Sequence, residues 1–401
     1  MKLAEPHSQK QQLADSIITA LLVLFLASSA FSIAIAQIAY FGALIIWAGK
    51  MLVERRNLVP RTPMDWYFVA FGIAEILSTL FSDYPLYAAL YMQRRLLIIP
   101  ILYILLGNVS TEKTARVFVT AFLASATGVA LWSLRELVLD FNSYATFQKR
   151  LGEFQIYMTT GTIMMFASLL VIPFAFHPQT PRKLRLLAVG VFTPLLVTLL
   201  FTFTRSAWLG FVTGIAVIVL QRRRLGGVVA LVAIVLVSLL AVPALRDRVV
   251  SIVDLQDATN SFRLKLWSIG LRIASDHPIV GIGDIGAETV WADYAPPEWR
   301  PEGHFHSNIV HWLVTLGGVG LAVVLALFVR IGVVLWRLHR DHSRGWFAGS
   351  VTLGALAALI AFHVNGLFEW SFGDTEVAMQ LWAMVGLALA AAKVTDLHPQ
   401  A

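Results

Sequence analysis

The feature that most constrains this fold is the recurrence of apolar runs of about 17–25 residues, the length that crosses a bilayer as a helix. We expect about twelve such spans, near residues 14–32, 34–53, 64–82, 94–109, 116–134, 156–176, 185–203, 206–221, 226–243, 307–330, 346–366 and 376–393. An even number of spans places both termini on the same side of the membrane. The pattern predicts an all-α polytopic membrane protein, because a helix satisfies its own backbone hydrogen bonds in lipid.

The composition excludes a soluble globular chain. Charged residues make up 14% of the sequence, hydrophobic residues 58%, and the mean hydropathy is +0.73, whereas a soluble domain carries about 25% charged residues. The chain has no cysteine, which excludes disulfides and argues against structural zinc. We attribute the net charge of +7 to loop residues that orient the helices, and expect no nucleic-acid partner. The first apolar run is too long for the core of a cleavable signal peptide.

Lysine and arginine residues gather in alternate predicted loops, which gives the chain an orientation. The basic loops contain Lys50, Arg55, Arg56, Arg61, Lys113, Arg116, Arg182, Lys183, Arg185, Arg222, Arg223, Arg224, Arg337, Arg340 and Arg344. All of them fall on the side of the termini, which the positive-inside rule makes cytoplasmic. We therefore divide the chain into nine spans in residues 1–243, an extracytoplasmic segment at 244–305 and three spans in 306–401. Residues 135–155 form a smaller extracytoplasmic loop.

The extracytoplasmic segment contains one predicted amphipathic helix, "NSFRLKLWSIGLRIASD" (residues 260–276). Asn260 is a suitable N-cap. Apolar residues recur at helical spacing, and they are Phe262, Leu266, Ile269 and Ile273. We expect this helix to lie on or near the membrane surface.

Three histidines, His304, His306 and His311, lie where this segment re-enters the membrane, in "GHFHSNIVHWLVTLGGVG" (residues 303–320). A metal site would require them to converge with carboxylates, and no HExxH-type spacing is present. A second interpretation makes them ordinary interfacial polar residues, with His311 packed inside its helix. A third is general-base chemistry, because an imidazole with a pKa of about 6.5 is mostly neutral at pH 7 and accepts a proton.

Two arginines on the extracytoplasmic side are candidates for binding phosphate. Arg205 lies in a gap of a few residues between two apolar spans, in "FTFTRSAWLG" (residues 201–210), and Arg263 lies on the predicted amphipathic helix. A guanidinium keeps its charge and offers a planar set of donors that suits phosphate oxygens. The competing interpretation is that both side chains are solvated anchors at the lipid head groups.

Four further charged residues on this side have no motif of their own. Arg94 and Arg95, at the start of the fourth span, are either additional phosphate ligands or structural residues. Glu369 and Asp374, in the last extracytoplasmic loop, are candidates for orienting His306 or pairing with an arginine. Charges this close to a bilayer are costly and are rarely retained without a role.

Several short motifs in this order resemble those of one family. His306 and Ser307, followed by nine residues and then "GGVG", fit the pattern H-[NSQ]-x9-G-x-x-G. The segments "TRSAWLGF", "SFRLKLWSIGLRIASDHPIVGIGDIG" and "RLGEFQ" are similar to that family's Ser/Arg segment, its R-x3-W helix with D-x-P-x-x-G-x-G, and its R-x-x-G-x-F. Together they resemble the bacterial O-antigen ligases (the WaaL type) of the O-antigen ligase/polymerase superfamily.

The resemblance implies a glycosyltransferase of GT-C-like architecture that needs no cofactor or metal. Its donor would be O-antigen on undecaprenyl diphosphate and its acceptor lipid A–core, joined at the periplasmic face of the bacterial inner membrane among membrane lipids. His306 would be the catalytic base, with His304 as a neighbour that shares or supports its role. Arg205 and Arg263, and on a weaker basis Arg94 and Arg95, would bind the diphosphate. We expect Gly317 and Gly320 to allow close helix packing.

Three other functions are weighed against this one. An O-antigen polymerase would use the same donor and a second lipid-linked glycan as acceptor, and a protein O-oligosaccharyltransferase would use a protein acceptor but is usually longer. A lipid or polysaccharide transporter is a hypothesis from a different class, suggested by the number of spans. We find no internal repeat of the kind that transporters carry, and the candidate charges gather on one side.

Overall fold

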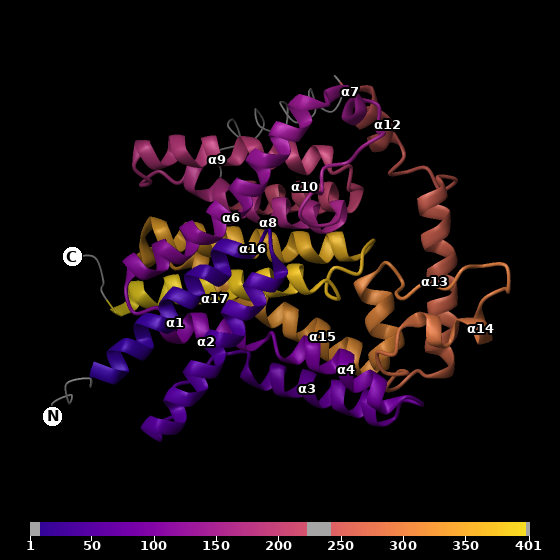
Figure 1. The fold of residues 1–401 in the computed structure, drawn as a ribbon, viewed down its shortest axis with the longest axis horizontal. Helices are drawn as coiled ribbons and strands as arrows, with labels where there is room; N and C mark the ends of the chain where they lie inside the picture. Colours follow the sequence, from indigo (N-terminus) through magenta and orange to yellow (C-terminus); the bar gives the residue numbers. More distant parts are fainter. Residues whose placement is uncertain (1–8, 223–241, 398–401) are drawn as a thin grey trace.

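The computed structural model describes residues 9–222 and 242–397, and over these residues it consists of helices and their connections, without strands (Figure 1). In this part of the chain, nine helices are long and apolar enough to cross a membrane. They are Gln9–Ser28 (α1), Ile33–Glu54 (α2), Pro85–Asn108 (α4 with α5), Glu112–Leu139 (α6), Tyr157–Phe176 (α8), Arg182–Phe201 (α9), Asn308–Arg340 (α15), Gly345–Gly366 (α16) and Thr375–Thr395 within α17 (Thr375–Leu397). The prediction of an all-α polytopic membrane protein is confirmed.

The remaining predicted spans correspond to shorter helices or fall outside the described residues. Residues 64–82 form α3 (Asp65–Leu80) and residues 206–221 form α10 (Arg205–Arg222). The span expected near residues 226–243 lies almost wholly outside the described residues.

The fourth predicted span, at residues 94–109, has the wrong start. Its helix begins at Pro85 and is divided into α4 (Pro85–Leu96) and α5 (Pro100–Asn108). The division precedes Pro100, whose ring removes a backbone donor and clashes with the preceding turn. Arg94 and Arg95 therefore end the first piece of the helix instead of opening the span.

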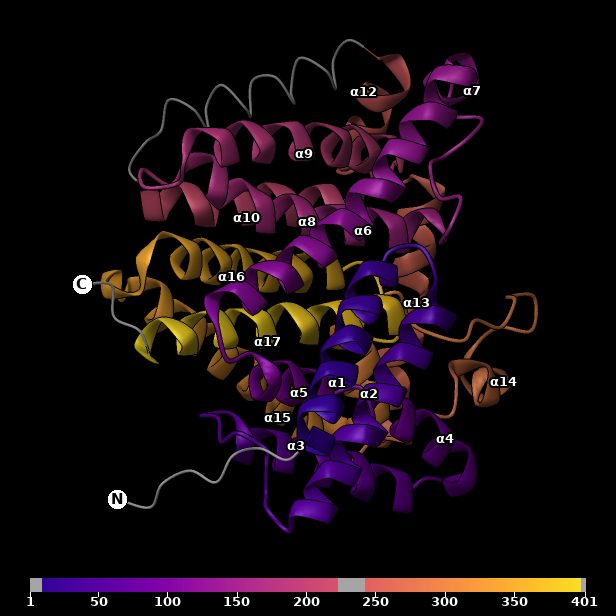
Figure 2. The ribbon, with the colours of Figure 1, turned by 60° about the vertical axis from the view of Figure 1, so that its left-hand side comes forward.

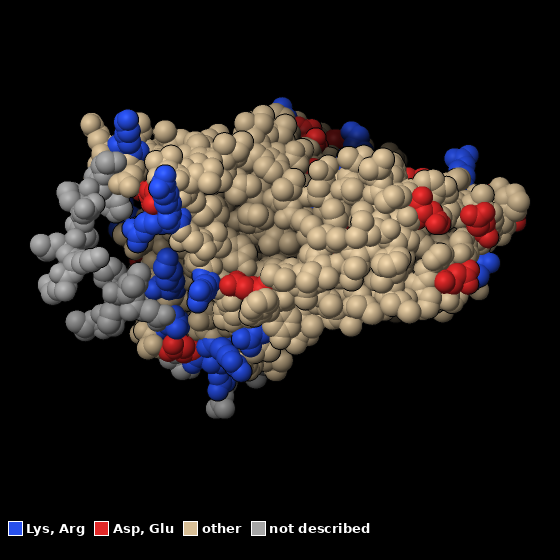
Figure 3. Space-filling view, turned by 90° about the horizontal axis from the view of Figure 1, so that it is seen from below, with Lys and Arg blue, Asp and Glu red and all other residues tan. Residues whose placement is uncertain are grey.

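The helices form a bundle whose central helices are buried and whose middle part carries few charged side chains on the surface. In the most apolar stretches of α8, α16 and α17, 83%, 78% and 94% of the residues are buried, against 28% in α1 and α2. Figure 2 shows α16 and α17 between α9 and α10 on one side and α3 on the other. The start of α1 and the end of α17 lie at the same end of the bundle. In the face shown in Figure 3, lysines and arginines gather at this end, a broad band carries almost no charge, and acidic and basic residues mix at the far end. We call the end where the lysines and arginines gather the basic end, and the opposite end the site end.

Helix α13 (Ala258–Asp276) crosses the site end of the bundle (Figure 1). The predicted apolar face is correct for Leu266, Ile269 and Ile273, which are buried in a small second core against α15, while Phe262 remains partly exposed. The predicted N-cap is wrong, because the helix begins two residues before Asn260. The carboxylate of Asp257 accepts hydrogen bonds from the first backbone donors of the helix.

The other short helices of the site end are α7 (Phe141–Ala145), α12 (Pro243–Val250), η1 (Ala287–Thr289) and α14 (Trp291–Tyr294). A further short helix, η2 (His342–Arg344), lies between α15 and α16.

Helix α15 is broken at Gly317, whose φ of 66° no other residue of the helix shares. A Cβ at this position would lie 2.3 Å from the carbonyl oxygen of Ile279. The expectation that Gly317 and Gly320 allow two helices to pack closely is therefore wrong. Gly317 permits a left-handed turn against the loop that follows α13, and a Cβ on Gly320 would meet Leu316 of its own helix.

The loop after α13 supplies the hydrogen bonds that the broken helix loses. The amides of Ile282 and Gly283 donate to the carbonyls of Val314 and Thr315, each over 3.0 Å. On the other side of the break, the amides of Gly318 and Val319 donate to Pro278 and Ile279, over 2.8 Å and 3.2 Å respectively. Backbone groups left unpaired at this depth would be costly, so the two glycine motifs form one junction.

Candidate active site

His306 stands immediately before α15 in a strained backbone conformation. Its φ is 45°, in the left-handed region that a non-glycine residue rarely adopts. Three contacts hold this turn: Ser307 caps α15 through Val310, the His306 amide donates to His304 Nδ1 over 3.3 Å, and the Trp267 indole donates to the carbonyl of Phe305 over 3.0 Å. Strain of this kind persists where the surroundings over-determine it, as in catalytic sites.

Glu369 orients the His306 ring. This loop residue between α16 and α17 places Oε1 2.9 Å from His306 Nδ1, and its Oε2 lies 3.4 Å from the Arg263 guanidinium. Burial alone would raise the pKa of Glu369, but the hydrogen bond and charge of His306, with Arg263, bring the pKa below its ordinary value. An ionised carboxylate only accepts hydrogen bonds, so Nδ1 carries the proton and Nε2 is left as the basic nitrogen.

Arg263 and Trp267 explain the R-x3-W spacing. Residues four apart lie on the same face of a helix, and here both side chains of α13 point toward the histidine turn. Arg263 reaches Glu369, and Trp267 reaches the backbone of Phe305. The Nε of Arg263 is buried and has no hydrogen-bond partner among the described residues. One donor of this side chain is therefore available to an anionic ligand.

Arg205, at the start of α10, is buried and already engaged. Its guanidinium donates to the Ser251 carbonyl over 2.6 Å, to Asn260 over 2.9 Å and to Asp257 over 3.0 Å. These contacts join α10 to the segment that leads into α13. Arg205 contributes positive charge to the site and fixes its wall, with fewer donors left over than Arg263.

Two arginines that sequence reasoning missed complete the cluster. Arg150 lies 4.4 Å from the ring of Phe147 and 4.4 Å from that of Tyr157, and Arg248 of α12 lies 5.3 Å from Phe147. Burial, and then the charges of Arg205 and Arg150, lower the pKa of Arg248 to about 10. Arg150 opens the quoted segment "RLGEFQ", which is a usable signal, whereas nothing in the sequence around Arg248 distinguishes it.

The site carries more positive than negative charge. Four guanidinium groups, those of Arg150, Arg205, Arg248 and Arg263, influence one another's ionisation, and their ion-pairing carboxylates among the described residues are Asp257 and Glu369. Two positive charges are thus left without a carboxylate. The helices α8, α10, α15 and α17 also begin at this end (Figure 1), and helix N-termini add partial positive charge. An anion with two or more charges fits this balance.

Arg95 and Arg94 do not reach the cluster. Arg95 is buried in ion pairs with Glu75, over 2.6 Å, and with Asp284 of the loop after α13. The two carboxylates offset its positive charge, and the side chain fixes that loop to α3 and α4. Arg94 is exposed on α4 and lies over the Tyr91 ring at 5.2 Å. His311 is buried 3.6 Å from Asp284 and packs on Trp370, as expected for a helix-packing residue.

A cavity of about 220 Å³ adjoins the histidine turn and is lined by His304, Glu369, Trp370 and Asp374, among others. Thr159 donates to Asp374. Burial, followed by the neighbouring Glu376, raises the pKa of Asp374 well above its usual range. Burial and the charge of His306 lower the pKa of His304 to about 4, so its ring is neutral at pH 7. Asp374 therefore lies beside the site without contacting His306.

One group of side chains in the described part of the chain has the composition of a metal site. Ligand atoms of His304, His306 and Glu369 lie within 4.8 Å of one another, and such a set suits zinc or iron. The Arg263 guanidinium, however, already pairs with Glu369 and would repel a divalent cation held by the same carboxylate. The arrangement fits an oriented base better than a metal centre.

Comparison with known protein families gives a match over part of the chain. Residues 189–325 match the family described as O-antigen ligase. The matched stretch runs from α9 into α15 and contains Arg205, Arg263, His306 and the junction at Gly317. No curated protein matches the chain.

Proposed function

The chain is a member of the O-antigen ligase/polymerase superfamily, and from this premise we propose that it is an O-antigen ligase. It transfers O-antigen polysaccharide from undecaprenyl diphosphate to lipid A–core. The site end faces the periplasm and the basic end faces the cytoplasm of a bacterium, in the inner membrane. Members of this family are glycosyltransferase-like enzymes that act on lipid-linked polysaccharides, so the proposal concerns the acceptor, the donor lipid and the mechanism.

The observation that carries the proposal is the excess positive charge beside an oriented histidine. Arg150 and Arg248 carry charges that no carboxylate among the described residues pairs with, and Arg263 keeps one donor without a partner there. Guanidinium groups match the geometry of phosphate oxygens. A diphosphate bound by them leaves the sugar that it carries next to His306.

The chemical step follows from these positions. The acceptor hydroxyl attacks the anomeric carbon of the donor sugar while its proton passes to His306 Nε2. The bond between that carbon and the phosphate oxygen breaks, and undecaprenyl diphosphate leaves with the bonding electrons. Direct attack on the face opposite the leaving group inverts the anomeric centre.

Two groups of residues lower the barrier in this scheme. Positioned cations stabilise the charge that develops on the diphosphate, an effect worth roughly 10²–10³ in rate for one donor. General-base catalysis by an oriented imidazole contributes roughly 10²–10⁴. Glu369 keeps the proton on Nδ1 and stabilises the imidazolium that forms, as a carboxylate does beside other catalytic histidines. The scheme needs no metal ion.

The acceptor distinguishes this proposal from the alternatives. We would incubate the full-length protein in detergent with an undecaprenyl-diphosphate glycan and, in parallel, with lipid A–core, a second lipid-linked glycan or a protein acceptor. The proposal expects product on lipid A–core alone. Elongation of the lipid-linked glycan identifies a polymerase, a glycosylated protein identifies an oligosaccharyltransferase, and movement across proteoliposomes without bond formation identifies a transporter.

A further inference from the structure

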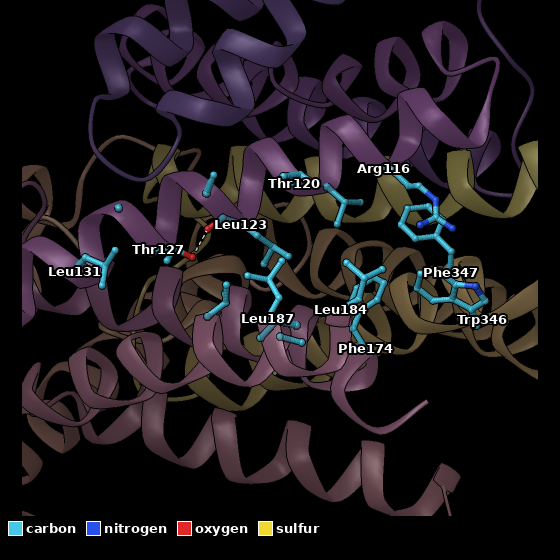
Figure 4. A pocket seen from close by; sticks show the side chains of 16 residues that line it. Arg116, Thr120, Leu123, Thr127, Leu131, Phe174, Leu184, Leu187, Trp346 and Phe347 are labelled. Atoms are coloured by element: carbon cyan, nitrogen blue, oxygen red, sulfur yellow. Dashed lines mark hydrogen bonds between the residues drawn. The ribbon is translucent and has the colours of Figure 1, made fainter. Parts of the chain in front are cut away.

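A second candidate site lies away from the histidine turn, on the side of the bundle. A groove of about 600 Å³ runs between α6 and α9 and is walled almost entirely by apolar side chains, including Leu123 and Leu131 of α6, Leu187 of α9 and Phe174 of α8 (Figure 4). Leu131 and Leu187 are exposed. This volume lies within the range of about 300–1,000 Å³ that small-molecule sites occupy.

The groove has one charged end. Arg116, near the start of α6, lies there with its guanidinium 4.6 Å from the Trp346 ring and 4.9 Å from the Phe347 ring (Figure 4). Glu112 pairs with it. Three more cations on the same two helices, Lys113, Arg182 and Lys183, are exposed beside this end. The charges at this end are therefore mainly positive, and the aromatic rings hold the guanidinium at the edge of the groove.

The groove has the length of a lipid chain. From Arg116 to Leu131 the helix advances fifteen residues, or about 22 Å, which is more than half of the roughly 30 Å hydrocarbon layer. It begins at the basic end, where the positive residues of a membrane protein meet anionic head groups.

We propose that this groove binds an anionic phospholipid, with one acyl chain between α6 and α9 and the phosphate at Arg116. A guanidinium pairs with a phosphate through two parallel hydrogen bonds. The neighbouring lysines and Arg182 favour a head group with net negative charge over a zwitterionic one. This site is independent of glycosyl transfer.

The same molecule offers an internal comparison. A second apolar groove of about 720 Å³, lined by α10, α15 and α16 and including Val329, Gly332 and Trp336, has no lysine or arginine in its described lining. It can accept a lipid chain by the same apolar contacts, and its nearest cation at Trp336 is Arg340, which lies 5.9 Å from that ring and outside the lining.

The test is native mass spectrometry of the full-length protein titrated with dioleoyl phosphatidylglycerol or with dioleoyl phosphatidylcholine. We expect preferential retention of phosphatidylglycerol. Arg116→Gln should remove that preference, reducing phosphatidylglycerol retention by roughly tenfold, the effect of losing a hydrogen bond to a charged group.

Two groove-filling variants give a second test and its matched control. A Cβ on Gly128 meets open space in the α6–α9 groove, so Gly128→Leu should reduce retention of both lipids at this site and remove the preference. Gly332→Leu, in the comparison groove, should leave the preference intact. Thermal unfolding of each variant reports whether it folds.

Three outcomes overturn the proposal. They are equal retention of the two lipids by the unaltered protein, a preference that survives in both folded variants Arg116→Gln and Gly128→Leu, and displacement of phosphatidylglycerol by undecaprenyl phosphate. The last would assign the groove to the donor lipid.

Discussion

His306, Glu369 and Arg263 form a chain of contacts in which each side chain sets the state of the next. The carboxylate lies against His306 Nδ1, and His306 together with Arg263 holds the pKa of that carboxylate below its ordinary value. The amide of His306 donates to His304, which holds the turn. On the proposed mechanism, His306 supplies the free nitrogen and His304 positions it.

The arginine cluster predicts different results for two arginines of one short helix. Arg248 faces Arg150 and Arg205, whereas Arg246, two residues earlier, is exposed and, among the residues that the structure describes, pairs with Asp247 alone. Arg248→Gln should lower kcat/KM for glycan transfer by roughly 10- to 100-fold, because a charged hydrogen-bond donor to the diphosphate is lost. Arg246→Gln should leave it unchanged. Equal effects of the two variants would show that Arg248 acts only through the general charge of the surface.

The lowered pKa of His304 predicts a loss of stability in acid. The pKa is about 4 in the folded protein and about 6.5 in the unfolded chain. Between pH 4 and pH 6.5 the unfolded chain binds a proton at this histidine that the folded protein does not. The contribution of neutral His304 to the free energy of unfolding is therefore fully present above pH 6.5 and is lost as the pH falls toward 4. His304→Asn keeps an acceptor near the His306 amide but does not titrate, so the decline of Tm from pH 7 to pH 4 should become shallower. A decline as steep as that of the unaltered protein would refute this cause.

At the scale of elements, the junction between α15 and the loop after α13 determines where His306 stands. The sequence motifs around Gly281 and Gly317 look independent, yet they exchange four backbone hydrogen bonds. Sequence patterns could not reveal this because the two motifs meet only when the chain folds back on itself. In the sequence, the break at Gly317 lies within a continuous apolar run. The division before Pro100 lies within another such run, so neither is visible from hydropathy.

A substitution at the break should therefore damage more than one helix. Gly317→Ala places a methyl group against the Ile279 carbonyl and strains a backbone with φ of 66°. We expect a loss of at least 1–3 kcal/mol, seen as a lower Tm, together with reduced transfer. Gly190→Ala is the control, because a Cβ there meets nothing within 4 Å and alanine favours a helix. Comparable Tm values for the two variants would contradict the claim that the junction requires a glycine at position 317.

For the whole molecule, the sequence predicted the architecture better than it predicted the site. Hydropathy and basic loops indicate a polytopic bundle because lipid imposes the same requirement on every spanning segment. The motifs point to His306, Arg205 and Arg263, and Arg150 opens one of the motif segments, "RLGEFQ". Arg248 joins the cluster from a segment that carries no signature of its own. The sequence left the role of Arg95 open because its carboxylate partners, Glu75 and Asp284, are remote in sequence.

The proposed orientation can be tested without altering native thiols, because the chain has no cysteine. Glu298→Cys lies at the site end and Lys113→Cys at the basic end, and both positions are exposed. A membrane-impermeant maleimide added to spheroplasts should label the first variant, and should label the second only after lysis. Labelling in the opposite order would invert the topology and remove the site from the periplasm.

The central claim is that His306 drives transfer from a lipid diphosphate without a metal ion. The most direct measurement is the joint yield of glycosylated lipid A–core and free undecaprenyl diphosphate, in EDTA, for the unaltered protein and for folded His306→Ala. We predict equal amounts of the two products, unaffected by EDTA, and a rate that falls by roughly 10²–10⁴ in the variant. An unchanged rate in His306→Ala, or activity that disappears in EDTA and returns with a divalent ion, would contradict the account.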